Sequence, residues 1–397
     1  MVFRTLLALG VVAALLPACG GGSDGGGDDP PPTPAATSTA PDGKAALGAA
    51  PTTKAPTPTA GSSGGTLRAG NPNGKAAVPA EARAVDTTKP NRVVGNGTAA
   101  SCTGKAVATA VAAGGVVTFS CGPDPITITM TQTAKVKNST KRVVLDGGGK
   151  VTLSGAGKRR ILYMNTCDDA QGPPPGDCTN QDHPQLTVQN LTFASGSSIG
   201  ADPDPEVTNG GGGGALYARG GRLKVINSRF VKNRCDSGGP DLGGAAIRVL
   251  DQNRDLPVYV VSSTFGGAAG QGGACSNGGA LSSIGVSWVI LNSLFSHNEA
   301  IGYGANEAAN GTPGGGNGGA IYCDGNTFTL RVAGTLMERN HAREGGGAIF
   351  YVSNDRSGTL RIESSTLRRN PSDEFETIPG IFYRANGEAQ ITASKIT

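Results

Sequence analysis

Two arginines and a series of aromatic residues are the side chains whose positions could serve ligand binding. Arg331 and Arg361 hold the same place in successive copies of a repeated unit, so their guanidinium groups could form a row that binds carboxylated sugars. Aromatic rings follow a second repeated element and could hold sugar rings; they belong to Tyr217, Tyr322, Phe350 and Phe382. The alternatives are a solvated outer face for the arginines and a cover of insertion loops over the rings.

The acidic residues form no recognisable catalytic set. Asp168 and Asp169 lie in a loop rich in glycine and proline, where carboxylates commonly serve solubility. Asp202, Asp204 and Glu206 alternate with prolines and could supply oxygen ligands to Ca²⁺, although an acidic surface loop is the other interpretation. The three histidines lack the spacing of metal ligands. We therefore assign no catalytic residue, no metal site and no required cofactor, and keep Ca²⁺ as an open alternative.

The first of the eight cysteines follows an apparent export signal. The apolar run from Leu6 to Leu16 is too short to span a bilayer, which predicts a signal peptide over residues 1–18. Leu16-Pro17-Ala18-Cys19 resembles the bacterial lipobox, and this resemblance implies a lipid on Cys19 and the membrane as a partner. An aspartate directly after the lipidated cysteine retains lipoproteins in the inner membrane, and this chain has Gly20 there. The resemblance therefore further implies an outer membrane lipoprotein, periplasmic or surface-exposed. The alternative is an ordinary signal peptide with an incidental cysteine.

Export implies an oxidising compartment, so the other seven cysteines are candidates for disulfides. Seven is an odd number, and local pairing leaves Cys323 as a free thiol. The sequence does not fix the connectivity. The local pairs that it favours are Cys102 with Cys121, Cys167 with Cys178, and Cys235 with Cys275.

Composition divides the chain into a linker and a folded part. The 397 residues include 64 glycines and 25 prolines, and no aromatic residue occurs between residues 20 and 100. Such a segment cannot bury enough apolar area to offset chain entropy, so we expect residues 19–100 to be the lipidated cysteine and a disordered linker. Residues 101–397 are then the folded domain. The net charge of +4 comes without a basic tract, so nucleic acid is not an expected partner.

The folded domain is predicted to begin with a capping helix. Thr103 can cap a helix that runs to about Ala113, and Gly114-Gly115 would end it. The stretch Val116–Phe119 is typical of a strand. A Cys102–Cys121 disulfide would then hold the helix over this first strand, where the end of a repeated structure needs a cover.

An eight-residue unit, here called the octad, recurs from residue 186 at intervals of roughly 30 to 40 residues. Its third position is always β-branched, its fifth is small, and its eighth is apolar, as a strand followed by a turn and a return to the core requires. The third positions are Val188, Val225, Val260, Ile290, Val332, Ile362 and Ile391. The fifth positions are Asn190, Asn227, Ser262, Asn292, Gly334, Ser364 and Ala393.

Two further elements recur between the octads. A Gly-Gly-Ala element followed by an aliphatic residue provides a sharp turn into another strand; its copies start at Gly213, Gly243, Gly278, Gly318 and Gly346. A Phe-x-x-Asn pattern starts at the last residue of several octads and continues beyond them, as in Phe230-Val-Lys-Asn233 and Phe295-Ser-His-Asn298. Three fixed elements per repeat predict an all-β solenoid.

These elements together resemble the repeats of polymorphic outer membrane proteins and, more broadly, the pectin-lyase-like superfamily. The resemblance covers about residues 185–397 and implies a single-stranded right-handed parallel β-helix, here with a short N-terminal capping helix. It implies little about function, because the superfamily includes lyases, hydrolases, adhesins and stalks. The arginine base with a calcium cluster of the pectate lyases and the paired aspartates of the polygalacturonases are not recognisable in this sequence.

The sequence therefore favours a membrane-anchored binding or structural module of the cell envelope, with a polysaccharide or a cell-surface molecule as partner. The alternative is a polysaccharide lyase or glycoside hydrolase that acts on an acidic glycan. A groove that gathers carboxylates and arginine would favour the enzyme.

Overall fold

The computed structural model describes residues 67–172, 176–200, 211–238, 242–304, 307 and 310–397. They belong to one compact unit, Ser62–Thr397. The described part contains one α-helix, α1 (Gly104–Ala113), and short 3₁₀ turns at η1 (Ala80–Ala82), η2 (Ala99–Ser101), η3 (Asp169–Gln171) and η5 (Asn253–Asp255). All other regular elements are strands, in three sheets.

The largest sheet, sheet A, has 17 strands. Its first members are β1 (Arg92–Val94), β2 (Gly115–Phe119), β3 (Ile126–Thr129), β5 (Arg142–Ser154), β7 (Gln185–Ala194), β9 (Arg222–Ile226), β10 (Arg229–Val231), β12 (Val258–Val261) and β13 (Thr264–Gly266). The others are β16 (Trp288–Leu291), β17 (Leu294–Ser296), β20 (Thr329–Ala333), β21 (Leu336–Glu338), β24 (Thr359–Glu363), β25 (Thr366–Arg368), β27 (Gln390–Thr392) and β28 (Lys395–Ile396).

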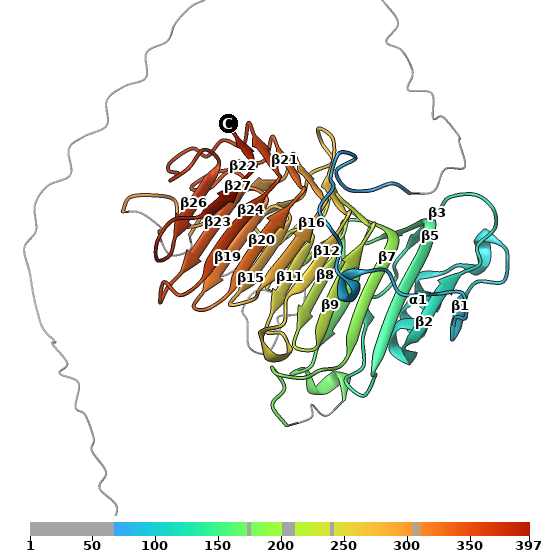
Figure 1. Ribbon diagram of the computed structural model, residues 1–397. Coiled ribbons are helices and arrows are strands. Elements are labelled where there is room, and N and C mark those ends of the chain that lie inside the picture. The colour runs from blue at the N-terminus through green and yellow to red at the C-terminus, as the bar shows by residue number, and fades with distance from the viewer. Residues whose placement is uncertain (1–66, 173–175, 201–210, 239–241, 305–306, 308–309) are drawn as a thin grey trace, which may run out of the picture. The chain divides into compact units, whose positions relative to one another are not determined.

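Sheet B has eight strands, each paired in parallel with the next one along the chain (Figure 1). They are β4 (Ala134–Lys135), β6 (Leu162–Asn165), β8 (Leu216–Arg219), β11 (Ile247–Leu250), β15 (Leu281–Ile284), β19 (Ile321–Gly325), β23 (Ile349–Ser353) and β26 (Ile381–Arg384). Sheet C contains β14 (Ala274–Cys275), β18 (Glu299–Ala300) and β22 (His341–Ala342). From β9 onward each repeat adds two strands to sheet A, and each repeat adds one strand to sheet B. Long parallel sheets of this kind are compatible with a β-helix solenoid.

The octad pattern is confirmed in sheet A, because equivalent positions pair across neighbouring strands. The third positions form an unbroken row from Val188 to Ile391. At the eighth position, Phe193, Phe230, Phe265 and Phe295 stack with ring centroids 5.0, 4.8 and 4.6 Å apart. Both rows belong to one continuous hydrophobic core. Burial of these aliphatic and aromatic side chains, about 1.5–3 kcal/mol for each, supplies the main stabilisation of the stack.

The fifth octad position bends the chain between two strands of sheet A. All seven residues at this position have left-handed backbone angles, with φ between 41° and 59°. Asparagine and glycine tolerate this region better than other residues, which explains their frequency here. The side chains also join the repeats, because Asn227 Nδ2 donates to Asn190 Oδ1 over 2.8 Å and Asn190 Nδ2 donates to Asp146 Oδ1 over 2.9 Å.

The Phe-x-x-Asn pattern forms a second, buried ladder. The Nδ2 of Asn298 donates to Oδ1 of Asn340, and that of Asn340 donates to Oδ1 of Asn370, each over 2.9 Å. The same Nδ2 atoms reach backbone carbonyls of neighbouring octads, such as Phe265 and Phe295. These asparagines therefore satisfy buried polar groups at the turn, which would otherwise cost several kcal/mol.

The predicted helix and disulfides are present. Thr103 accepts a hydrogen bond from the amide of Ala106 at the start of α1, and Gly114 follows its end. The disulfides are Cys102–Cys121, Cys167–Cys178 and Cys235–Cys275, and Cys323 is a buried free thiol. Burial raises the pKa of Cys323 to about 12, so this thiol stays protonated and unreactive at neutral pH.

One predicted boundary is wrong. Residues 67–100 were expected to be linker but are part of the folded unit, which includes β1 within this range. The first of them, residues 67–91, here called the strap, cross the strands of sheet A (blue in Figure 1). Asn227 donates to the carbonyl of Leu67 and accepts from the amide of Ala69, both over 3.0 Å. Asn292 binds the amide and carbonyl of Ala76 over 2.7 and 2.9 Å. Hydrogen bonds between the strap backbone and these asparagine side chains hold the strap in place. An argument from the composition of the strap's own side chains does not detect them.

The strap also covers an apolar surface. Ala82 is fully buried against the fourth octad positions, which are Ile226, Val261, Leu291 and Ala333. The linker prediction for residues 19–66 lies outside the described residues.

Candidate functional site

Arg331 and Arg361 lie side by side in β20 and β24, as the register of the octads predicts. Arg331, however, is engaged by Glu363, with distances of 3.0 Å from Nε to Oε1 and 2.7 Å from NH2 to Oε2. This hydrogen-bonded ion pair raises the pKa of Arg331 and lowers that of Glu363. Arg361 is exposed. A carboxylated sugar would therefore meet one accessible guanidinium at this place and would have to displace Glu363 to reach the other.

The predicted aromatic series is covered. Tyr217 is 0% exposed, Tyr322 8% and Phe350 5%, and Phe382 is partly buried. The rings do stack across strands, with centroids 5.1 Å apart for Tyr322 and Phe350 and 4.9 Å for Phe350 and Phe382. Direct sugar stacking on Tyr217, Tyr322 or Phe350 is therefore wrong for this conformation of the chain, since packing against neighbouring residues occupies the outer face of sheet B.

The row of sheet B that holds these rings also contains Arg248, which the sequence analysis did not identify. A Gly-Gly-Ala element that starts at Gly243 would place Ile247 in the row, but the register places Arg248 there, paired with Tyr217 and Ser282. The turn glycine of this repeat is Gly244 rather than Gly243, since its φ of 69° matches those of the other turn glycines. The one-residue shift moves Ile247 into the core and buries Arg248 at 1% exposure.

A polar pocket of about 230 Å³ lies where β11 and β15 of sheet B end. Three segments that are distant in the sequence form its lining, which includes two aspartates and one arginine. These residues are Thr179, Asn180, Asp251, Gln252, Arg254, Asp255, Gly285 and Val286. The volume is small for a ligand pocket, whose usual range is about 300–1,000 Å³, so it suits one small polar group, such as a single sugar unit.

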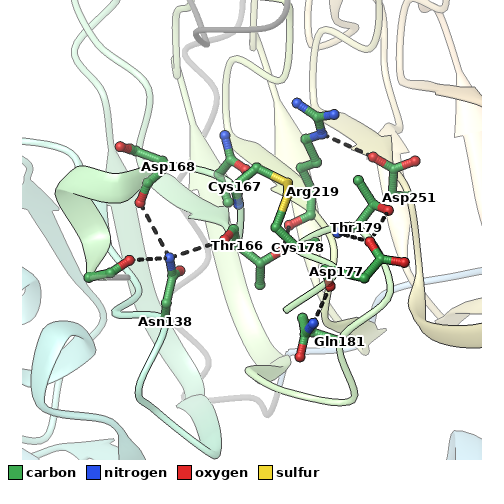
Figure 2. Close-up of a disulfide and its surroundings, with 12 residues drawn as sticks. Asn138, Thr166, Cys167, Asp168, Asp177, Cys178, Thr179, Gln181, Arg219 and Asp251 are labelled. Atoms are coloured by element: carbon green, nitrogen blue, oxygen red, sulfur yellow. Dashed lines mark hydrogen bonds and ion pairs between the residues drawn. A yellow bond between two sulfur atoms is a disulfide. The ribbon is translucent and has the colours of Figure 1, made fainter. Parts of the chain in front are cut away.

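The Cys167–Cys178 disulfide positions one wall of this pocket (Figure 2). It closes the loop that leads directly into Thr179 and Asn180. Asn180 Oδ1 then accepts a hydrogen bond from the backbone amide of Arg254 over 2.7 Å. The disulfide-closed loop and the loop after β11 are therefore fixed to each other across the pocket.

Ion pairing sets the charge of the pocket. Arg219 Nε donates to Asp251 Oδ2 over 2.9 Å, and Figure 2 shows Arg219 pointing toward this carboxylate. The Arg219 side chain is 10% exposed, so its charge is screened little by water, while Asp251 is 38% exposed and opens to the pocket. Asp255 and Arg254 bring one further charge of each sign. The lining is thus polar but nearly balanced in charge.

The backbone at the pocket is held in an unfavourable conformation. Asp251, Arg254 and Asp255 have φ of 54°, 49° and 55°, in the left-handed region that residues other than glycine rarely occupy. Each such residue costs about 1–3 kcal/mol and persists only where the surroundings enforce it, a situation that is common at binding and active sites. The one local signal for this loop is the polar run Asp251–Asp255, which lies two residues before an octad.

Two predicted features lie outside the described residues. Asp202, Asp204 and Glu206, the candidate calcium ligands, lie outside them, and so does Cys19. In the part of the chain that the structure describes, no group of three or more His, Cys, Asp or Glu side chains is arranged to hold a metal ion. No helix among those residues is long and apolar enough to cross a membrane.

Comparisons with known proteins give no relative: no family model, no curated protein and no solved structure matches this chain.

Proposed function

We propose that the chain is a right-handed parallel β-helix of the pectin-lyase-like kind that serves the cell envelope as a carbohydrate-binding module. The repeat register in sheets A and B supports the fold. A lipid on Cys19 would hold the module at the outer membrane, which the lipobox-like sequence supports.

The polar pocket beside the Cys167–Cys178 loop is the observation that carries this proposal. Sugar hydroxyl groups both donate and accept, so they pair well with carboxylate, amide and guanidinium groups. The pocket offers these groups from Asp251, Asp255, Asn180 and Arg254. The loops that carry them are fixed by a disulfide and by the Asn180–Arg254 hydrogen bond, so little entropy is lost on binding. The proposal moves the sugar contact from the covered aromatic rings to this pocket.

Calorimetric titration with short and long oligomers of galacturonate and of cellulose tests the proposal. Arg254→Asn and Asp255→Asn should each raise Kd about tenfold, which corresponds to ~1.4 kcal/mol, since each removes a charged contact while asparagine tolerates the left-handed backbone. Arg356→Asn is the matched control, because Arg356 is also exposed at a left-handed φ of 64°. Equal binding by all three variants, or no binding of either oligomer series, would refute the pocket as a glycan site.

The alternative is a glycoside hydrolase or polysaccharide lyase, and one observation favours it: the two carboxylates Asp251 and Asp255 share a pocket with Arg254. A carboxylate pair can divide the roles of acid and base or nucleophile. Incubation with polygalacturonate and Ca²⁺ separates the two functions. New reducing ends or unsaturated uronate that disappear in Asp251→Asn would replace the binding proposal with the enzyme, whereas binding without turnover supports the module.

A further inference from the structure

A groove separates α1 from β1 at the first end of sheet A, where Figure 1 shows both elements next to β2. Within the part of the chain that the structure describes, β1 pairs with β2 alone, so its other side is a free strand edge. Edge strands carry unpaired N–H and C=O groups that can accept another strand. This edge is short, and Pro90 precedes it, which limits pairing to a short segment of chain.

The groove has room for a short segment of chain beside β1. Its volume is about 460 Å³, and β1 with Gly95 forms one wall. The opposite wall is formed by α1, through the small side chains of Ala106, Thr109, Ala110 and Ala113. Val93 of β1 is 51% exposed, which leaves an apolar contact open on the surface beside the edge.

The groove is also basic. Arg92 and Lys105 line it, and the first turn of α1 contains no acidic residue. A second hollow of about 640 Å³ shares Arg92 and Ala113 with the groove and adds Lys141 and Arg142. None of these four cations forms an ion pair with another described residue. The N-terminal end of α1 contributes further positive potential.

We propose that this groove binds a short acidic peptide in extended conformation, which adds to β1 as a further strand. A free edge beside a helix is the arrangement in which strand addition gives affinity through the backbone, while neighbouring side chains select the sequence. Here the selecting side chains are Arg92 and Lys105, so the peptide is acidic. The proposal is independent of the glycan pocket, which lies at the ends of sheet B strands.

Fluorescence anisotropy with the full chain and a labelled peptide of alternating glutamate and valine tests this site. The acidic peptide should bind and weaken as salt rises, and a lysine–valine peptide should not bind. The double variant Arg92→Glu with Lys105→Glu should weaken binding at least tenfold. Thr109→Trp, an exposed helix position that lines the groove, should do the same by filling it. Lys158→Glu is the matched control, since Lys158 is exposed and lies outside the groove.

Backbone methylation distinguishes strand addition from simple attraction of anions. Two variants of the acidic peptide keep its charge: one is N-methylated on the odd-numbered residues and the other on the even-numbered residues. Since successive N–H groups of an extended peptide point to opposite edges, each variant loses the N–H donors of one edge of the peptide. One of the two should lose binding and the other should keep it. The proposal fails if the parent acidic peptide does not bind, if Thr109→Trp leaves binding unchanged, or if both methylated peptides bind as well as the parent.

Discussion

At the scale of single residues, Asp146 joins the strap to the octad turns. Its Oδ2 accepts from Thr87 Oγ1 over 2.7 Å and from Gln189 Nε2 over 2.9 Å. Its Oδ1 accepts from Asn190 Nδ2 and from the amide of Gly148, both over 2.9 Å. Burial alone would raise the pKa of Asp146, but these four hydrogen bonds outweigh it and hold the pKa below its usual value.

This depressed pKa makes stability depend on pH. Because the folded pKa lies below the unfolded value of about 3.9, the ionised Asp146 stabilises the fold above that value and loses its effect as pH falls through the folded pKa. At pH 7, Asp146→Asn should lower the free energy of unfolding by about 1–3 kcal/mol. Urea unfolding of both proteins from neutral to acid pH should show this difference shrinking below about pH 3.9. A difference that stays constant into acid would contradict it.

Single residues also show what the sequence could and could not predict. The row from Val188 to Ile391 could be predicted from the octad periodicity. A shift of one residue in any strand would turn its apolar side chains from the core to the solvent, so the register is strongly determined. The position of Arg248 did not follow from periodicity, because the four small residues before Ile247 allow two alignments of the turn. The backbone angle of Gly244 and the strand register decide between them. Asp251 and Arg219 meet across strands, and no local pattern predicts such a pair.

At the scale of elements, the strap depends on the asparagine side chains at the octad turns. Asn292→Ala removes the pair of hydrogen bonds to Ala76 and leaves that backbone without its partner. We expect the strap to open more often, because each lost buried hydrogen bond costs about 1–3 kcal/mol. Limited trypsin digestion should then cleave faster after Lys75 and Arg83, which lie in the strap. Unchanged cleavage, with Lys158→Ala as the control, would show that the apolar contacts of Ala82 suffice.

The strap shows that amino-acid composition alone does not distinguish a linker from a folded segment. Its residues are small or polar and resemble a linker, and one of its few strong apolar contacts is a single alanine, Ala82. What orders it is a set of partners on Gln189, Asn227 and Asn292, more than 100 positions away along the chain. Capping of α1 by Thr103, in contrast, is local and was predictable to the residue.

At the scale of the whole molecule, the predicted anchor stays a prediction that one variant can test. Cys19→Ser removes the thiol to which the lipid would be attached, so the protein should move from the membrane fraction to the soluble fraction. Ultracentrifugation after a high-salt wash, followed by immunoblotting, measures this. Sedimentation of the variant with membranes would contradict the lipid. Cys323→Ser is the control, because Cys323 is a buried free thiol in the folded unit.

The strap also has a consequence for the order of folding. It is the first part of the described chain to be synthesised, but Ala76 binds Asn292, which is 216 positions later, and Asn71 binds Gly334, which is 263 positions later. These partners exist only after several repeats have stacked, and contacts between such distant positions form slowly. The strap residues from Asn71 to Ala76 therefore dock late although they are made early, and nascent chains that end before Asn292 should leave the amide of Ala76 unprotected against hydrogen exchange.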